Sequence, residues 1–274
     1  MKKTLILLII LTLTSCASVF NKRIIKKLGV ENEKTELKFI DNIEQEIIFI
    51  PMHHVGRKRY YNDIANKVDS LQKLKYVVFY EGVTDNKEKD SLIRKKSLLK
   101  LRRIMGFFPQ GKKGYLDTTT NIIAGKIKYK GKYKLINQPN YKLLKVDSLS
   151  SIRADINLTE LITDFEKNYG KIKIDSCDYK TDLKDKNYRC GKAKRGLRKK
   201  FENGYVKDYR NKYLAEQIFK SNKNKILVIY GDAHFFGLYW ELNLLDNDYT
   251  IIRTFKKDYT RDSIRTFKKN IIKK

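Results

Sequence analysis

Residues 226–234, Ile-Leu-Val-Ile-Tyr-Gly-Asp-Ala-His, contain the clearest strand signal in the chain. Five consecutive apolar residues that end at a glycine are typical of a strand buried on both faces of a sheet. The apolar segment 235–245 follows directly and is predicted to be a helix. A buried strand that leads straight into a helix indicates an α/β fold.

Other strands and helices alternate outward from this segment. Strands are predicted at 35–40, 46–50, 76–80, 133–136 and 249–253, and helices at 59–74, 87–105, 158–168 and 205–221. This alternation predicts a single α/β domain at 35–274, with a mixed, mostly parallel central sheet flanked by helices. A polar, charged segment at about 170–195 is predicted to be an insertion outside the sheet.

The composition supports a folded and strongly basic protein. The chain has 274 residues, of which 41% are hydrophobic, including 18 Tyr and 13 Phe, so a sizeable core is available and wholesale disorder is excluded. Lys and Arg number 60 against 31 Asp and Glu, which gives a net charge of +29. Two explanations stay open: a compositional bias spread along the chain, or a surface that attracts an anionic partner.

The amino-terminal residues have the features of an export signal. Met1-Lys2-Lys3 precedes the apolar stretch 5–13, and Leu13-Thr14-Ser15-Cys16 resembles a bacterial lipobox. This resemblance implies that residues 1–15 are removed, that Cys16 is acylated, and that 16–34 form a tether to a membrane of the bacterial cell envelope. It places the domain outside the cytoplasm, on the periplasmic side, where no nucleic-acid partner is expected. An ordinary secretory signal with a chance cysteine is the alternative.

Two cysteines remain after Cys16. Cys177 and Cys190 both lie in the polar insertion, and export would place them in an oxidising compartment. We therefore expect a Cys177–Cys190 disulfide that staples the insertion, with two free buried thiols as the alternative.

All three histidines of the chain follow predicted strands. His53, His54 and His234 stand directly after two of them, and Glu81 follows a third. The carboxyl ends of the strands in an α/β sheet meet at one edge, where sites assemble. Two or three imidazoles and a carboxylate suit a divalent metal ion, and they equally suit metal-free acid/base chemistry. Turn and surface residues without a function are the remaining interpretation.

Competing catalytic classes lack their motifs. The chain has no Gly-rich phosphate loop and no Gly-x-Ser-x-Gly nucleophile elbow. The cysteines of the insertion are remote in sequence from the histidines, which argues against a thiol nucleophile.

Four short motifs, which occur in the same order along the chain, resemble those of the TraB/GumN family. These are Ile50 to Gly56, Val77 to Gly82, Arg210 to Ala215, and Ile226 to Gly237; Pro51 departs from the pattern by replacing the glycine of the family's first turn. The family includes the Tiki-type metalloproteases and is distantly similar to erythromycin-esterase-like and ChaN-like proteins.

The resemblance implies a role for each matched residue. His54, Glu81 and His234 would form the metal or acid/base set, with Arg210 acting beside them. The residues expected to bind substrate or support this set are His53, Asn211 and Asp232. The first hypothesis is thus a lipid-anchored, metal-dependent hydrolase with a peptide substrate. The second is a non-enzymatic envelope lipoprotein that binds a ligand, a partner or an anionic lipid surface.

Overall fold

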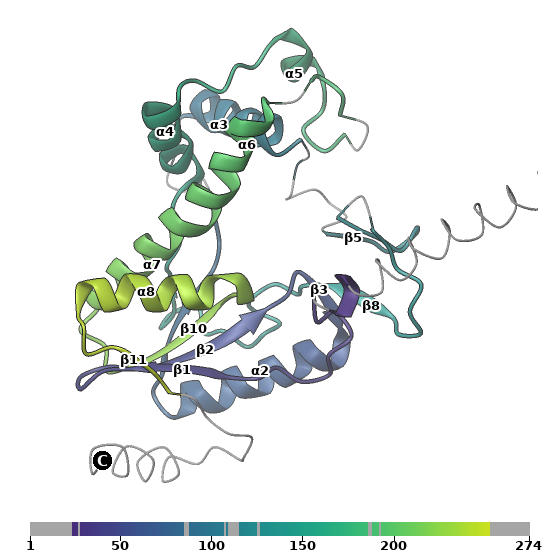
Figure 1. Ribbon diagram of the computed structural model, residues 1–274. Coiled ribbons are helices and arrows are strands. Elements are labelled where there is room, and N and C mark those ends of the chain that lie inside the picture. Colours follow the sequence, from purple (N-terminus) through teal and green to yellow (C-terminus); the bar gives the residue numbers. More distant parts are fainter. Residues whose placement is uncertain are drawn as a thin grey trace, which may run out of the picture.

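A six-stranded sheet forms the centre of the protein in this computed structural model, which describes residues 24–252 apart from 27, 85–87, 107, 109–114, 125–126, 186–187 and 192. The strand order is β11-β1-β2-β10-β4-β9, and Figure 1 labels β11, β1, β2 and β10. The strands are β1 (Lys38–Asp41), β2 (Glu46–Met52), β4 (Val77–Tyr80), β9 (Ile152–Arg153), β10 (Lys225–Gly231) and β11 (Thr250–Ile252).

Four of these strands are parallel. β10 pairs with β2 on one side and β4 on the other, β4 pairs with β9, and all three pairings are parallel. β1 is antiparallel to both of its neighbours, β2 and β11. The prediction of a mixed, mostly parallel sheet is therefore confirmed, and the carboxyl ends of β2, β10, β4 and β9 lie at one edge.

Helices cover both faces of the sheet, as predicted. The helices α7 (Arg210–Phe219) and α8 (Phe235–Leu245) pack on one face, through a cluster that includes Phe49, Val228 and Leu238. The helix α2 (Lys58–Lys73) covers the other face, where Ile64 and Val68 pack against the sheet. Alternate residues of β10 join the two clusters, because successive side chains of a strand point to opposite faces.

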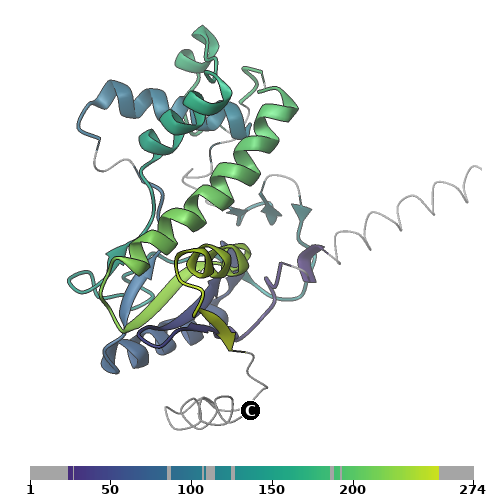
Figure 2. The ribbon, with the colours of Figure 1, turned by 60° about the vertical axis from the view of Figure 1, so that its left-hand side comes forward.

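A helical lobe extends from the sheet (Figures 1 and 2). Its helices are α3 (Ser91–Met105), α4 (Leu158–Tyr169), α5 (Ser176–Lys180) and α6 (Arg195–Lys200). The lobe has its own apolar cluster, with Phe165 and Phe201 fully buried. A π-helical segment, η1 (Phe201–Tyr209), continues α6 directly into α7, so one long helix runs from the lobe to the sheet.

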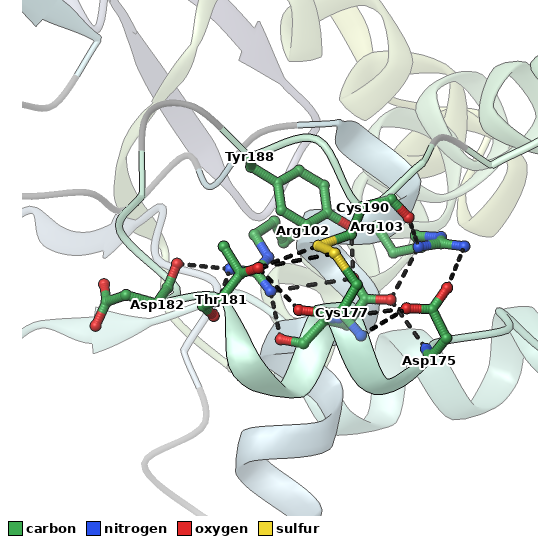
Figure 3. The surroundings of a disulfide bond; sticks show 9 residues. Arg102, Arg103, Asp175, Cys177, Thr181, Asp182, Tyr188 and Cys190 are labelled. Atoms are coloured by element: carbon green, nitrogen blue, oxygen red, sulfur yellow. Dashed lines mark hydrogen bonds and ion pairs between the residues drawn. A yellow bond between two sulfur atoms is a disulfide. The ribbon is translucent and has the colours of Figure 1, made fainter.

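The predicted disulfide is present in this lobe. Cys177 and Cys190 are bonded, with their Cα atoms 5.4 Å apart (Figure 3). Two arginines of α3 also hold the insertion, and no pattern in the sequence indicates these contacts. Buried Arg102 donates to the carbonyl oxygens of Asp178 and Asp182, both at 2.7 Å, and Arg103 Nη1 lies 2.9 Å from the Asp178 carboxylate.

A small β module lies beside the main sheet. It contains β3 (Val55–Arg57) paired with β8 (Leu135–Asn137), and the short strands β5 (Leu116–Asp117), β6 (Ile122–Ile123) and β7 (Ile127–Lys128). Its apolar cluster includes Ile25 and Val30.

The end of the predicted tether differs from a free linker. Ile25 and Val30 are buried in the small β module, and Glu31 accepts a hydrogen bond of 2.8 Å from Tyr129. Residues 24–26 and 28–31 thus belong to the folded body, because Ile25 and Val30 find an apolar cluster there. The predicted signal peptide and Cys16 lie outside the described residues. Across the chain that the structure describes, no helix combines the length and the apolar character needed to cross a membrane.

Candidate functional site

Polar residues follow three parallel strands at the carboxyl edge of the sheet. Glu81 follows β4, Asp155 follows β9, and His234 follows β10. Arg210, the first residue of α7, reaches this edge from the helix above. The pairing of β10 with β4, and of β4 with β9, brings these residues together although they are up to 153 positions apart.

Arg210 links the two carboxylates. Its Nε and Nη2 donate to the two oxygens of Asp155, at 2.9 and 2.6 Å, and Nη2 also lies 2.7 Å from Glu81 Oε1. Its remaining nitrogen, Nη1, donates to the carbonyl oxygen of Val206 at 3.3 Å. Asp155 is 1% exposed, and a charged carboxylate at that depth is stabilised by this pairing and by hydrogen bonds of 2.9 Å from the backbone N–H groups of Gly82 and Ile156.

Glu81 is held at both oxygens. Besides the contact with Arg210, its Oε2 accepts a hydrogen bond of 2.9 Å from the backbone N–H of Gly231. Burial disfavours the charged form, but the neighbouring Arg210, with smaller contributions from His234 and His54, outweighs burial and lowers the pKa of Glu81 to about 2. Glu81 is therefore an ionised acceptor at neutral pH.

His234 is fixed by an amide and a glycine. Its Nδ1 lies 2.7 Å from Asn211 Oδ1, an acceptor, so the Nδ1 carries the proton and Nε2 is the basic nitrogen. The side chain of Asn211 occupies the space beside Gly237, where an added Cβ would lie 1.9 Å from Asn211 Nδ2. Gly237 is thus required for the position of Asn211, and through it for the orientation of His234.

Burial keeps His234 neutral. The side chain is 6% exposed, and this desolvation, together with the positive charge of Arg210, lowers its pKa to about 4. Glu81 is close by, because Glu81 Oε2 and His234 Cδ2 both lie 3.5 Å from the position of a Cβ added at Gly231. Glu81 Oε2 and His234 Cδ2 are therefore separated by at most twice 3.5 Å.

The two adjacent histidines that follow β2 have different surroundings. His54 is exposed, stacks on Tyr115 with ring centroids 4.0 Å apart, and has its Nδ1 3.2 Å from Gln138 Oε1. His54 is close enough to Glu81 to contribute to the lowering of its pKa. His53 instead stacks on Tyr60, with ring centroids 4.9 Å apart.

His53 and Asp232 line a separate cavity of about 340 Å³. Lys38 joins them and forms an ion pair with Asp232. Burial lowers the pKa of His53, which favours its neutral form. The structure thus divides the predicted site residues into two groups, one around Arg210 and one around this cavity, both at the same edge of the sheet.

Sequence reasoning missed three residues near Arg210. Asp155 follows a strand of two residues, which is too short to show a period, and no motif marks it. Burial raises the pKa of Tyr115 and of Tyr141, and the charge of Glu81 adds to this in both cases. The two tyrosines come from segments without a strong pattern, so only the fold shows that they border the carboxylate.

The chemistry of the donors suits a divalent cation, but their arrangement is not a ready-made site. Both His54 and His234 have Nδ1 engaged by an amide oxygen, so their Nε2 atoms are free to act as ligands. Within the described ranges, however, no three His, Cys, Asp or Glu side chains are grouped so that they could hold a metal ion. Metal binding by His54, Glu81 and His234 stays a prediction.

Comparison with known proteins adds no relative. Neither family models, nor curated proteins, nor solved structures match the chain. The resemblance to the TraB/GumN family stays a prediction that rests on the four short motifs.

Proposed function

We propose that the protein is a hydrolase of the bacterial cell envelope in which His234 performs the acid/base chemistry. The observation that carries the proposal is the oriented, neutral imidazole of His234 beside the paired charges of Arg210 and Glu81. A neutral imidazole can accept a proton from water at neutral pH, and its Nε2 is the nitrogen left free to do so.

The other residues have positioning roles in this proposal. Asn211 holds the tautomer of His234, as Gly237 holds Asn211. Arg210 keeps Glu81 ionised, and Asp155 keeps Arg210 in place. The cavity lined by His53, Lys38 and Asp232 would receive a polar part of the substrate. A peptide is the first substrate class to test, by the resemblance alone.

A divalent metal ion remains a proposal for the same site. His54, Glu81 and His234 would hold it, since two imidazoles and a carboxylate are ligands typical of such ions. The ion would supply a polarising charge and a more acidic water. Because the three side chains are not grouped as ligands in the described residues, we derive no step through it.

The proposal has a metal-free form and a metal-dependent form. Activity measurements on the purified protein test the first, and its metal content tests the second. The parent is expected to cleave members of a peptide library, and His234→Gln should reduce kcat/KM by about 100-fold or more, the usual contribution of an acid/base group. His53→Gln is the matched control, because His53 lies with the other group, and it should keep kcat while raising KM. Full activity in His234→Gln would contradict the proposal.

The metal form makes its own prediction. The parent would then contain a stoichiometric divalent ion, and His54→Ala and His234→Ala would each lose it. Equal metal content in the parent and both variants would contradict the metal-dependent form of the proposal and leave the metal-free form.

A non-enzymatic envelope lipoprotein is the second candidate. The observation that favours it is the saturation of the central ion pairs, since every guanidinium nitrogen of Arg210 and both oxygens of Glu81 already have protein partners. No cleavage of any library member by the parent would favour this candidate. Both candidates keep the proposed acylation of Cys16, which mass spectrometry of the amino-terminal peptide from the native host tests.

A further inference from the structure

A line of lysines crosses the small β module. Lys128, Lys130, Lys132 and Lys134 alternate with other residues, and all four are exposed. Tyr129 is buried, and Ile127 and Tyr133 are half-buried. The apolar and aromatic side chains are thus covered to a greater extent than the four lysines, which face solvent along one short stretch of chain, where Lys128 donates to the carbonyl oxygen of Thr120 and Lys132 lies over the Tyr133 ring. We call these four residues the lysine ribbon.

The ribbon is not neutralised by the described part of the protein. Among the described residues, no ribbon lysine forms an ion pair with an acidic side chain. The acidic groups beside it have other partners: Glu31 accepts from Tyr129, and Glu33 pairs with Arg57 at 2.7 Å. Unpaired like charges on a surface repel one another, and an anionic partner relieves this repulsion.

The ribbon lies on the module into which the chain enters. Ile25 and Val30 pack into this module together with Leu135 of β8, and Figure 1 places the first described residues beside β8. Seven residues separate Cys16 from Ile24. Whatever its conformation, a chain of that length spans at most about 30 Å. An acylated Cys16 would hold this module, rather than the helical lobe, next to the bilayer.

We propose that the lysine ribbon docks the protein onto the anionic lipid headgroups of the membrane that holds Cys16. The inference rests on the proposed acylation and deepens it, because it names the face that meets the lipid. Acyl chains provide the attachment, and the ribbon sets the orientation: lysines near an anionic surface each add a favourable, salt-dependent interaction.

Lysine labelling of the acylated mature protein, which begins at Cys16 and is reconstituted in vesicles, tests the proposal. Vesicles of phosphatidylcholine with about a third phosphatidylglycerol are compared with pure phosphatidylcholine. On the anionic vesicles, the ribbon lysines should react with an acylating reagent at least about fivefold more slowly, the factor expected for one surface-bound lysine. High salt should abolish this protection, because it screens surface charge. Lys171, Lys173, Lys180 and Lys199, exposed in the helical lobe, are the reference and should react equally on both vesicles.

Two charge variants separate docking from general basicity. The ribbon variant changes its four lysines to Gln, and the control variant changes Lys171, Lys173, Lys180 and Lys199 to Gln, so both lose the same charge. Hydrogen exchange at 127–135 should slow on anionic vesicles in the parent and in the control variant, and not in the ribbon variant.

The outcomes distinguish docking by the lysine ribbon from acylation of Cys16. An acylated protein whose ribbon lysines react as fast on anionic as on neutral vesicles overturns the docking proposal and leaves the anchor intact. An unacylated amino terminus in the product of the native host overturns both.

Discussion

Arg210 is the residue on which the candidate site depends, since it neutralises a carboxylate that is almost fully buried. Removal of its guanidinium would leave Asp155 charged and unpaired in the interior, and would leave Glu81 without its cation. Removal of one partner of a buried ion pair lowers the free energy of unfolding by about 3–5 kcal/mol.

We therefore expect Arg210→Ala to lower the free energy of unfolding by about 3–5 kcal/mol in urea denaturation. Arg198→Ala is the control, because Arg198 pairs with Glu202 at the surface, where such a pair contributes at most about 1 kcal/mol. A loss in Arg210→Ala no larger than in the control would show that the buried pair does not stabilise the fold.

His234 makes stability depend on pH. Its pKa in the folded protein is about 4, against 6.5 for an ordinary histidine, so the unfolded chain binds the proton more tightly. The contribution of His234 is fully present above pH 6.5, and it is lost as the pH falls from 6.5 to 4, by up to about 3 kcal/mol. Glu81 adds a second loss below its ordinary pKa of 4.5, down to about pH 2.

Urea denaturation at a series of pH values measures this dependence. The parent should lose stability between pH 6.5 and 4, and His234→Gln should show a smaller slope in that window with the slope below pH 4.5 retained. Parallel curves for the two proteins from pH 7 to 4 would contradict the lowered pKa of His234.

The helices α7 and α8 meet where one glycine makes room for one amide. A methyl group at position 237 would collide with Asn211, which cannot move without releasing His234. We expect Gly237→Ala to destabilise the protein by about 1–3 kcal/mol, the range for overpacking.

Gly204→Ala is the matched control, because Gly204 also lies inside a helical segment, in the long helix that ends in α7. Nothing lies within 4 Å of the Cβ that this substitution would add at Gly204 in η1, so the change should stabilise the protein by up to about 1 kcal/mol through helix propensity. Thermal unfolding of the two variants measures the contrast, and equal shifts would show that Asn211 is not confined by Gly237.

Long elements could be predicted from the sequence, and short ones could not. The helix at 59–74 is predictable because its apolar residues repeat at helical spacing, and the strand at 226–230 and the helix at 235–245 are predictable because each is a continuous apolar run. β9, β5, β6 and β7 have two residues each, which is too few to show a period. Asp155 was missed together with β9, because a residue that follows a strand can be predicted as a site residue only when the strand itself is predicted.

The sequence also placed His53 and His54 together, whereas the structure separates their surroundings. Glu81 and His234 were expected to lie at one edge, and the parallel pairing of β4 and β10 confirms that. The direction of each imidazole was not predictable, since it depends on Tyr60, Tyr115 and Gln138, which come from three other segments.

At the scale of the whole molecule, the disulfide belongs to the helical lobe alone. The bond closes a loop across a sequence separation of 13 residues, for which chain entropy gives roughly 3 kcal/mol. Arg102 and Arg103 hold the same loop independently (Figure 3). We expect reduction to speed hydrogen exchange at 175–190 and to leave exchange in β2, β4 and β10 unchanged. Faster exchange throughout the central sheet would show that the lobe and the sheet unfold as one unit.

The position of β10 has a consequence for biosynthesis. This strand lies between β2 and β4, yet the ribosome makes it about 145 residues after β4. Until it emerges, the two earlier strands have no neighbour to bridge them, so the nascent chain cannot assemble its sheet from the amino terminus onward. Contacts this remote in sequence also form slowly. The central sheet of this topology therefore cannot be completed until residues 225–231 have been synthesised.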